Sequence, residues 1–308
     1  MTNNLYLVWL EWPEKCFRVD AEALRYLRTA VPKGSRVLRT RSEAAFLRAL
    51  PQATHAIVWN FKAEWFAKAP RLKVLATPAA GQEFVPTKGP EGVKIHFGHY
   101  HGRIIAESVL GFMLCWAKGF FAVREAPRNC RDWPRTWLSG RCTDVAGSKA
   151  VIVGYGNVGR AIGAKLLALG VEVEGFSRKN IGALATGVKT ADWLILALPS
   201  TTGTDDFLDA VLIRKLPRKC VVINVGRANA VDERALVAAL KAGRIAGAYL
   251  DVFKREKSQI WSECSARDGS IDFLHAKIPN LVLMPHSSAF SPKYVLSCLE
   301  ELKRDGCL

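Results

Sequence analysis

The sequence predicts an α/β protein of two domains, each a doubly wound parallel sheet covered by helices. The chain has 308 residues, enough for two domains of roughly 100–200 residues each. Short apolar runs alternate with helical patterns almost from the first residue, as in successive βα units. Apolar residues make up 49% of the chain and charged residues 23%, which excludes a disordered or fibrous protein.

The first hundred residues predict one α/β layer, because strand-length apolar runs alternate there with runs whose apolar residues recur at helical spacing. We expect strands at residues 5–9, 36–38, 56–59 and 74–76 and helices at 21–30 and 43–50. The last of these strands runs into a loop of small residues, 77–81.

A second α/β unit begins at Gly147, after a long helical pattern at 104–123 and a surface arm rich in Arg and Trp at 128–141. We expect its strands at 149–153, 171–176, 193–198, 221–225, 246–250 and 281–284, and its helices at 157–169, 210–216 and 233–241. The chain is expected to return to the first layer after Ala289. The predicted domains are therefore 1–101 plus 290–308, and 102–289.

Charge and cysteine usage limit the partners and the compartment. Lys and Arg number 44 against 28 Asp and Glu, a net charge of +16, which suits anionic partners. Residues 251–308 carry eight basic and eight acidic side chains, so the excess is spread over the first 250 residues without a basic arm, and we expect no nucleic-acid partner. The eight cysteines include no Cys-x-x-Cys pair, and no signal peptide or membrane-spanning run is visible. We expect a cytoplasmic protein with no membrane partner.

A glycine-rich turn is the strongest local signal. Residues 154–159, Gly-Tyr-Gly-Asn-Val-Gly, follow an apolar strand and open a helix, which is the context in which a GxGxxG motif binds a dinucleotide. The helix N-terminus and its free amides then hold the pyrophosphate. We expect cofactor contacts from Gly154, Gly156, Asn157, Val158 and Gly159. The alternative is a glycine-rich turn that binds nothing.

The end of the next strand bears on the choice of cofactor. An NAD site places an acid there for the ribose hydroxyls, whereas a 2′-phosphate needs hydroxyl and cationic donors. Glu174 lies inside the predicted strand, and Ser177, Arg178 and Lys179 follow it. We therefore predict NADP(H) in preference to NAD(H). In the alternative, Arg178 and Lys179 are solvated loop charges and Glu174 is the ribose acid.

Three further segments resemble the D-isomer-specific 2-hydroxyacid dehydrogenase family, whose members include glyoxylate and hydroxypyruvate reductases. They are residues 223–227 with 231–233 (Ile-Asn-Val-Gly-Arg, Val-Asp-Glu), 250–256 (Leu-Asp-Val-Phe-Lys-Arg-Glu) and 284–287 (Met-Pro-His-Ser). With the glycine-rich turn they stand in the family's order. The resemblance implies a Rossmann-like dinucleotide-binding domain, a flavodoxin-like substrate-binding domain and an active-site cleft between them.

The resemblance also implies the roles of three polar residues. Arg227 matches the family's substrate-orienting arginine, Glu256 its acid and His286 its general acid/base. A planar guanidinium suits the adjacent carboxylate and carbonyl of a 2-oxo acid, and a histidine beside the carbonyl oxygen can deliver a proton. The family's proline after the acid is Lys257 here, and Glu263 is the alternative acid.

Further residues match cofactor and substrate contacts of the family. Asp251 matches the position that holds the nicotinamide carboxamide, and Ala80 and Gly81 resemble the loop whose amides face the substrate carboxylate. His101 falls where relatives often place an asparagine near the substrate, and a hinge-packing histidine is the alternative. The other expected cofactor contacts are Leu198, Pro199, Val225 and Gly226.

Two features depart from the family pattern. His96, His99 and His101 have the spacing of metal ligands, but they precede the family's interdomain helix and the family needs no metal, so we predict no metal site. Relatives fit a short helix after the second strand of this domain, whereas residues 180–187 offer little for one. We therefore expect a more open groove beside the adenosine end of the cofactor.

The sequence thus predicts an oxidoreductase that transfers hydride between NAD(P)H and C2 of a small 2-oxo acid or D-2-hydroxy acid, of the glyoxylate or hydroxypyruvate reductase type. A dinucleotide-sensing, corepressor-like protein on the same scaffold is the alternative. The arm at residues 133–137 and the long helix resemble the family's dimer contact, which implies a homodimer.

Overall fold

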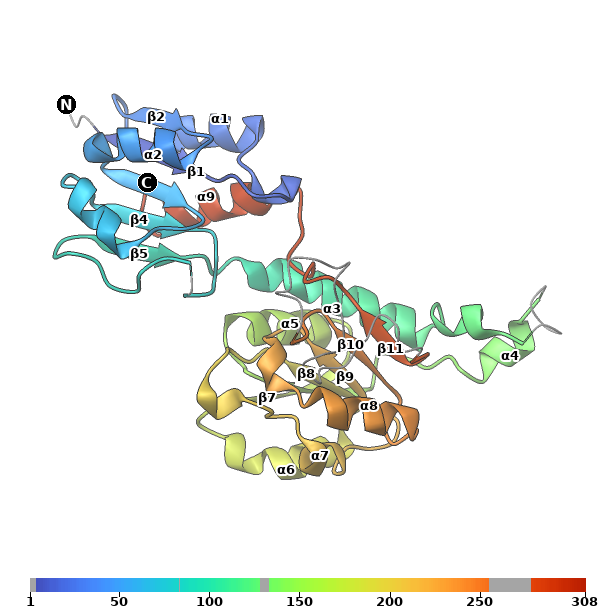
Figure 1. The fold of residues 1–308 in the computed structure, drawn as a ribbon. Coiled ribbons are helices and arrows are strands. Elements are labelled where there is room, and N and C mark those ends of the chain that lie inside the picture. Colours follow the sequence, from blue (N-terminus) through green and yellow to red (C-terminus); the bar gives the residue numbers. More distant parts are fainter. Residues whose placement is uncertain (1–3, 83, 128–132, 255–277) are drawn as a thin grey trace. The chain divides into compact units, whose positions relative to one another are not determined.

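The computed structural model describes residues 4–82, 84–127, 133–254 and 278–308. The chain divides into two compact units, Met1–His101 with Phe290–Leu308, and Gly102–Ala289. Each unit has its own parallel sheet with helices on its faces (Figure 1). The predicted fold class, two parallel-sheet α/β domains, is therefore confirmed.

The first unit contains a five-stranded sheet with the order β2-β1-β3-β4-β5, in which every pairing is parallel. Its strands are β1 (Leu5–Trp9), β2 (Arg36–Arg39), β3 (His55–Val58), β4 (Val74–Thr77) and β5 (Lys94–Phe97). The strand order reverses between β1 and β3, because the chain moves from β1 to β2 on one side and from β3 to β5 on the other. Ligands of doubly wound sheets bind outside the carboxyl ends of the strands at such a point.

Helices cover both faces of this sheet. They are α1 (Ala21–Ala30), α2 (Glu43–Ala49) and α9 (Tyr294–Arg304). The carboxylate of Asp20 accepts a hydrogen bond from Ala23 N at the start of α1, and the Ser42 hydroxyl caps α2 in the same way. α2 buries Phe46 against the sheet, and α9, at the C-terminal end of the chain, packs beside α1 (Figure 1).

Two elements of this unit do not appear among the predicted ones. β5 lies at the sheet edge and contains only two apolar residues, so it lacks the apolar run that identifies a buried strand. α9 buries Val295, Leu299 and Leu302 along one face, and this amphipathic spacing is a helix signal that the sequence analysis missed.

The second unit contains a six-stranded parallel sheet with the order β11-β10-β9-β8-β6-β7. Its strands are β6 (Lys149–Val153), β7 (Glu172–Phe176), β8 (Trp193–Leu196), β9 (Val221–Asn224), β10 (Gly247–Leu250) and β11 (Leu281–Leu283). Its helices are α3 (His101–Ala117), α4 (Arg135–Ser139), α5 (Asn157–Ala168), α6 (Leu184–Gly187), α7 (Ala210–Ile213) and α8 (Glu233–Lys241). The order reverses between β6 and β8, which gives this unit its own switch point.

Alternate side chains of the strands enter two different cores, because successive residues of a strand point to opposite faces. Ala150 and Ile152 pack with α3 and α5 on one face. Val151 and Val153 pack with α6, α7 and α8 on the other. The inner strands β8, β9 and β10 are buried on both faces and mostly apolar, whereas edge strand β7 carries Glu172 and Glu174.

The helical predictions between strands need two corrections. The long helix ends at Ala117 rather than at 123, and a short 3₁₀ helix, Ala122–Glu125, follows a break at Gly119, whose φ of +72° suits glycine. A short helix, α6, does follow β7, contrary to the expected gap. Leu184 and Val188 lie one turn apart and are buried in the core, so two apolar side chains at helical spacing suffice to hold it.

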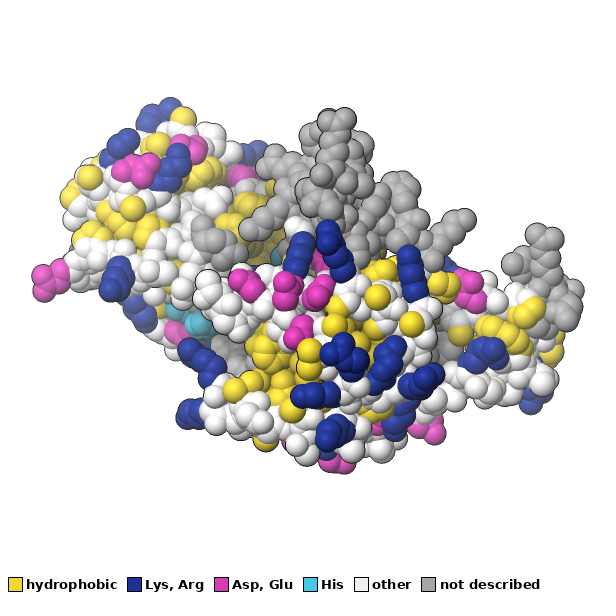
Figure 2. Space-filling view, turned by 60° about the horizontal axis from the view of Figure 1, so that its bottom comes forward, with side chains coloured by type: hydrophobic (Ala, Val, Ile, Leu, Met, Phe, Trp, Pro, Cys, Tyr) yellow, Lys and Arg dark blue, Asp and Glu magenta, His cyan; other side chains and the backbone are white. Residues whose placement is uncertain are grey.

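Surface charge is distributed over both units. Figure 2 shows Lys and Arg side chains interspersed with Asp and Glu on the visible faces. Among the described residues, no helix has both the length and the apolar character that a bilayer crossing needs.

Candidate functional site

The residues predicted to bind the cofactor and to act on the substrate in the second unit lie at the carboxyl edge of its sheet. Each follows a parallel strand directly, and the carboxyl ends of parallel strands share one edge. The strands concerned and their following residues are β6 (154–159), β7 (177–179), β8 (198 and 199), β9 (225–227), β10 (251) and β11 (286).

The glycine-rich turn has the geometry that a dinucleotide pyrophosphate requires. Gly154 has a φ of +90°, and a Cβ there would lie 2.5 Å from the carbonyl oxygen of Ala197. A Cβ on Gly159 would lie 2.5 Å from the carbonyl oxygen of Gly154. A Cβ on Gly156 would have no neighbour within 4 Å. The first and third glycines are therefore required by packing, whereas the second leaves open space at the N-terminus of α5, where an anion can approach the backbone.

The loops after β8 and β9 pack closely beside this turn. A Cβ on Gly226 would lie 2.6 Å from both the backbone nitrogen and the carbonyl oxygen of Leu198. Gly154 in turn approaches Ala197. The loop ends of β6, β8 and β9 thus form one continuous backbone surface at the switch point, and the residues present fit a dinucleotide.

Glu174 pairs with a lysine of the neighbouring strand. Its carboxylate lies 2.9 Å from Nζ of Lys149, the first residue of β6, and this hydrogen bond raises the pKa of Lys149. In the sheet register Lys149 pairs with Glu172, two residues before Glu174. Glu174 is therefore already paired with a lysine of the neighbouring strand.

The residues after β7 form a tight turn held by Asn180. The Asn180 amide oxygen accepts a hydrogen bond from Ser177 N at 2.8 Å, and its amide nitrogen donates to the carbonyl oxygen of Gly175 at 2.9 Å. Arg178 and Lys179 lie exposed on this turn. The turn therefore presents a hydroxyl and two cations at the carboxyl end of β7, directly after Gly175 and Phe176.

Arg227 is positioned by Asn224, a residue that the sequence analysis did not assign. The Asn224 side chain is fully buried; its oxygen accepts from Gly226 N at 3.1 Å and its nitrogen donates to the Arg227 carbonyl at 3.1 Å. These bonds close the loop around Val225 and hold the backbone of Arg227 extended. In the sequence, Asn224 is a polar residue at the end of an otherwise apolar strand. A buried amide side chain needs hydrogen-bond partners, and this was the sequence signal for its role.

His286 lies on a turn that Asp251 holds in place. The His286 backbone is left-handed, with φ of +52°, a conformation that is costly for a residue with a Cβ. The carbonyl oxygen of Asp251 accepts from His286 N at 2.9 Å. Its carboxylate accepts from Ser287 N at 2.9 Å and from Ser288 N at 3.1 and 3.2 Å. Asp251 is 3% exposed, so both carboxylate oxygens are engaged with the backbone of this turn.

Two hydroxyls complete the support of the His286 turn. The hydroxyl of Tyr249 lies 3.3 Å from the hydroxyl of Ser288, and burial raises the pKa of Tyr249 to about 12, so its proton is retained. The Ser108 hydroxyl of α3 donates to the Ser288 carbonyl at 2.9 Å. The turn is thus tied to β10 and to α3, and its His286 side chain is exposed.

The predicted carboxylate loop lies after β4 in the first unit. Thr77 Oγ1 accepts from Ala79 N at 3.2 Å, and the Ala79 carbonyl accepts from Gly98 N at 3.0 Å. Within the described part of the chain, the N–H groups of Ala80 and Gly81 donate to no other protein group. Ala80 is exposed and Gly81 half-exposed, so two adjacent amides are available to an anion.

His101 is 6% exposed, and its Nε2 lies 2.8 Å from the hydroxyl of Tyr294 in α9. Its ring also stacks on Tyr100, with centroids 4.3 Å apart. These contacts favour the alternative of a packing histidine over a substrate contact.

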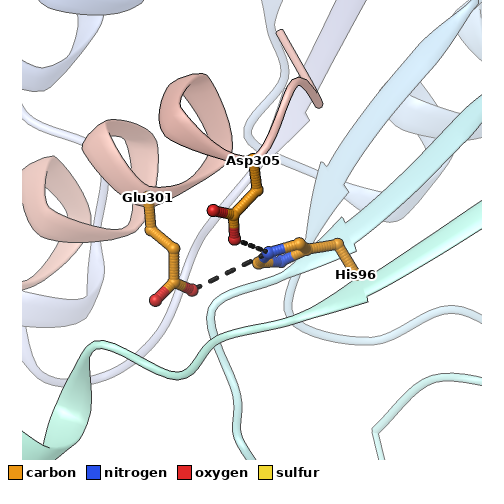
Figure 3. Close-up of side chains that lie close together, drawn as sticks. All are labelled: His96, Glu301 and Asp305. Atoms are coloured by element: carbon orange, nitrogen blue, oxygen red, sulfur yellow. Dashed lines mark hydrogen bonds and ion pairs between the residues drawn. The ribbon is translucent and has the colours of Figure 1, made fainter.

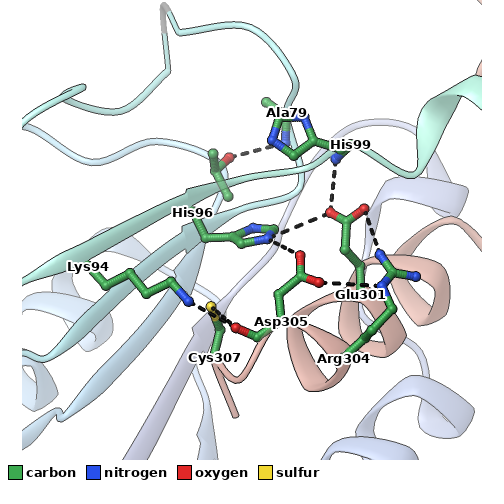
Figure 4. Close-up of polar contacts among 9 residues, drawn as sticks. Ala79, Lys94, His96, His99, Glu301, Arg304, Asp305 and Cys307 are labelled. Carbon is green, nitrogen blue, oxygen red and sulfur yellow. Dashed lines mark hydrogen bonds and ion pairs between the residues drawn. The ribbon is translucent and has the colours of Figure 1, made fainter. Parts of the chain in front are cut away.

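His96 forms a cluster with two carboxylates of α9 and its C-terminal end (Figure 3). Its Nε2 lies 3.0 Å from Oδ2 of Asp305 and 3.9 Å from Oε1 of Glu301, and the three ligand atoms lie within 4.8 Å of one another. Such a set can bind a cation. However, Arg304 lies 3.3–3.4 Å from both carboxylates, and Lys94 donates to the Asp305 carbonyl at 2.9 Å (Figure 4). Arg304 thus pairs with both carboxylates, and the contacts of His96 and Lys94 with Asp305 hold the C-terminal end of α9 against β5.

Among the described residues, the group of close ligand atoms contains His96 with Glu301 and Asp305, and neither His99 nor His101 belongs to it. The rings of His96 and His99 lie 6.1 Å apart, and the backbone N–H of His99 donates to Glu301 at 2.8 Å. Glu256 and the alternative Glu263 lie outside the described residues, so the acid of the predicted catalytic set stays a prediction.

Comparison with protein families matches residues 110–288 to the NAD-binding domain of D-isomer-specific 2-hydroxyacid dehydrogenases. A glycerate dehydrogenase of Methylorubrum extorquens is 29% identical over 235 residues, covering 73% of this chain and 72% of the relative. A glyoxylate reductase of Pyrococcus furiosus is 30% identical over 213 residues, covering 63% of each chain.

Solved structures share the fold over nearly the whole chain. A D-isomer-specific 2-hydroxyacid dehydrogenase of Lactobacillus delbrueckii ssp. bulgaricus, in its NAD-complexed form, has a TM-score of 0.78 at 18% identity, covering 98% of this chain and 96% of the other. One from Xanthobacter autotrophicus, in complex with NADPH and MES, has a TM-score of 0.70 at 23% identity, covering 97% and 93%.

Proposed function

Because the chain belongs to the D-isomer-specific 2-hydroxyacid dehydrogenase family, we propose that it is an NADPH-preferring reductase that converts a small 2-oxo acid to the D-2-hydroxy acid. The family makes it an oxidoreductase of 2-hydroxy acids with a nicotinamide cofactor. The observation that carries the proposal is the gathering of Arg227 and His286 at the same sheet edge as an open glycine turn. The relatives named glycerate dehydrogenase and glyoxylate reductase make hydroxypyruvate and glyoxylate the first substrates to assay.

Each residue has a chemical task in this proposal. The nicotinamide supplies the hydride when the cofactor is bound. Gly156 and the first amides of α5 hold the pyrophosphate. The Arg227 guanidinium binds the carboxylate and carbonyl oxygens of the substrate and orients C2. His286 donates a proton to the carbonyl oxygen, while the amides of Ala80 and Gly81 bind the substrate carboxylate.

The preference for NADPH rests on the turn after β7. A 2′-phosphate carries about two negative charges and accepts several hydrogen bonds, which Ser177, Arg178 and Lys179 can supply. Glu174, the residue that would favour NAD, is engaged with Lys149. NADH should therefore support the same reaction with a higher KM.

The test is steady-state oxidation of NADPH with glyoxylate, hydroxypyruvate and bulkier 2-oxo acids, for the wild type and for His286→Ala. We expect the variant to lose most turnover, a factor of 10²–10⁴ for a missing general acid, while NADPH binding, followed by its fluorescence, is unchanged. Equal turnover of the two proteins would remove His286 from the reaction. NADPH binding without reduction of any 2-oxo acid would favour a dinucleotide sensor.

A homodimer is part of the proposal, supported by exposed apolar residues on the segment from α3 to α4. Phe120 is 65% exposed and Trp133 78% exposed, and α4 projects away from the sheet of its own unit (Figure 1). Exposed apolar surface of this kind marks contact sites between proteins. Light scattering coupled to size exclusion, with Trp133→Ser as the variant, measures the oligomeric state.

A further inference from the structure

Five aromatic rings of the first unit form a continuous row, and the buried ring of Tyr294 in α9 packs against two of them, with centroids 4.6 Å from Phe17 and 5.9 Å from Trp59. In order of contact the centroid distances are 5.2 Å from Phe290 to Phe17, 5.4 Å from Phe17 to Trp59, 5.3 Å from Trp59 to Trp12 and 6.2 Å from Trp12 to Phe84. These separations are typical of interacting rings. We call these five residues the aromatic row.

The row lies at the switch point of the first sheet. Trp12 comes three residues after β1, and Trp59 directly follows β3, the two strands between which the order reverses. The crevice outside the carboxyl ends of two such strands is where doubly wound sheets bind ligands. In this unit the two tryptophans stand at that place.

The row also flanks the proposed carboxylate loop. The carbonyl of Trp59 accepts a hydrogen bond from Thr77 Oγ1 at 3.4 Å, and Thr77 begins the turn to Ala80. On the far side of this loop, the carbonyl of Phe84 accepts from Phe61 N at 3.0 Å. Two residues of the row thus stand at the ends of the proposed carboxylate loop.

The rings differ in exposure in a way that suits a binding surface. Trp59 is buried and its indole N–H donates to the Phe17 carbonyl at 3.0 Å, so it forms the base of the row. Trp12, Phe17 and Phe84 are half-buried, and Phe290 is 43% exposed. The Arg18 guanidinium donates to the carbonyls of Trp12 and Pro13, which holds the Trp12 loop in place.

We propose that the aromatic row binds the side chain of the substrate, so that the preferred substrates are 2-oxo acids with an aryl or bulky branched group on C3. This inference rests on the proposed function. Burial of such a group against the rings favours substrate binding. Glyoxylate carries only a hydrogen at this position, which covers none of the aromatic surface. The hydroxymethyl group of hydroxypyruvate would lose hydration against the rings. Glyoxylate and hydroxypyruvate are then substrates of lower efficiency.

The experiment compares kcat/KM for phenylpyruvate, 4-methyl-2-oxopentanoate, hydroxypyruvate and glyoxylate in the wild type, Trp12→Ala and Trp12→Phe. We expect the wild type to prefer phenylpyruvate over glyoxylate by roughly 10- to 100-fold, the range for burial of one large side chain. Trp12→Ala should reduce this preference about tenfold, mainly through KM, and Trp12→Phe should retain most of it. Tyr26→Ala is the matched control, because Tyr26 is a half-buried ring of the same unit that lies outside the row.

Binding without turnover separates this inference from the proposed function. Saturation-transfer NMR with phenylpyruvate and NADP⁺ reports contact of the phenyl protons with the protein, and Trp12→Ala should weaken that signal. Ring contact without reduction of any 2-oxo acid supports the aromatic site and contradicts the proposed function. A wild type with a higher kcat/KM for glyoxylate than for phenylpyruvate overturns the aromatic site. An equal change of kcat/KM for all four substrates in Trp12→Ala overturns it as well, whatever the stability of the variants.

Discussion

Replacement of Asp251 by alanine tests whether this carboxylate holds the His286 turn. In the structure its two oxygens accept hydrogen bonds from Ser287 N and Ser288 N at 2.9–3.2 Å. The family resemblance assigns the same residue to the nicotinamide carboxamide. The two roles predict different losses, because a residue that only contacts the cofactor contributes nothing to the stability of the protein without cofactor.

The magnitude follows from the groups left unpaired. Ser288 is 3% exposed, so its N–H would lose its partner in a place that water does not reach, at about 1–3 kcal/mol. The hydrogen bond from the less buried Ser287 N to the charged carboxylate contributes about 1.5–3 kcal/mol more. The left-handed His286 backbone can partly relax in the variant, which reduces the loss of stability by about 1 kcal/mol. We expect a net loss of about 3 kcal/mol, or a fall in Tm of ~6–12 °C for a domain of this size.

The assay is thermal unfolding of the protein without cofactor, followed by NADPH binding and turnover of the same samples. Asp144→Ala is the control, because Asp144 is exposed and pairs only with Lys118 at the surface, and it should leave Tm unchanged. For Asp251→Ala we expect the lower Tm together with a kcat reduced at least tenfold. An unchanged Tm with weakened NADPH binding would refute the positioning role and support the carboxamide contact alone.

Two further predictions concern cofactor choice and acid stability. Arg178→Ala should raise the KM for NADPH roughly tenfold or more, the value of one charge-assisted hydrogen bond, and leave the KM for NADH unchanged. The exposed Lys189→Ala is the control, and equal effects of Arg178→Ala on both cofactors would contradict the NADP preference. Burial, with the charge of Lys73, lowers the pKa of His55 to about 4 in the folded protein. Below the ordinary pKa of about 6.5 the unfolded chain therefore binds a proton that the folded protein does not bind. The stability of the folded protein thus falls as the pH drops from 6.5 to 4, by up to about 3 kcal/mol. Urea unfolding at pH 7.5 and 4.5 measures this fall, which His55→Phe should reduce; an equal fall in the variant and the wild type would show that the pKa of His55 is the same in the folded and unfolded chains.

Local patterns were sufficient for the buried strands and for the glycine turn. Strands such as β6 and β9 are buried on both faces, so their apolar runs identify them without tertiary information. The glycine turn is recognised from its spacing between β6 and α5, although the contact that excludes a Cβ at Gly154 comes from Ala197, which follows β8. Edge strand β5 lacks such a pattern, since half of its residues are polar.

Other assignments depended on partners far away in the chain. His96 was considered with its sequence neighbours, yet its ring pairs with Asp305, 209 residues later. His101 meets Tyr294 in the same way. Spacing alone cannot identify such partners, because the path of the chain through the sheet decides which residues meet.

The sequence by itself determined the fold class, the family and the residues available for chemistry at the second sheet, because these depend on short motifs read strand by strand. Only the tertiary structure decided how those residues are held. It paired Glu174 with Lys149, closed the Arg227 loop around Asn224, and engaged Asp251 with the His286 turn. It also aligned five aromatic residues from four separate segments into one row. The physical reason is that parallel strands bring distant loops to one edge, where hydrogen bonds and packing select among the side chains that the sequence supplies.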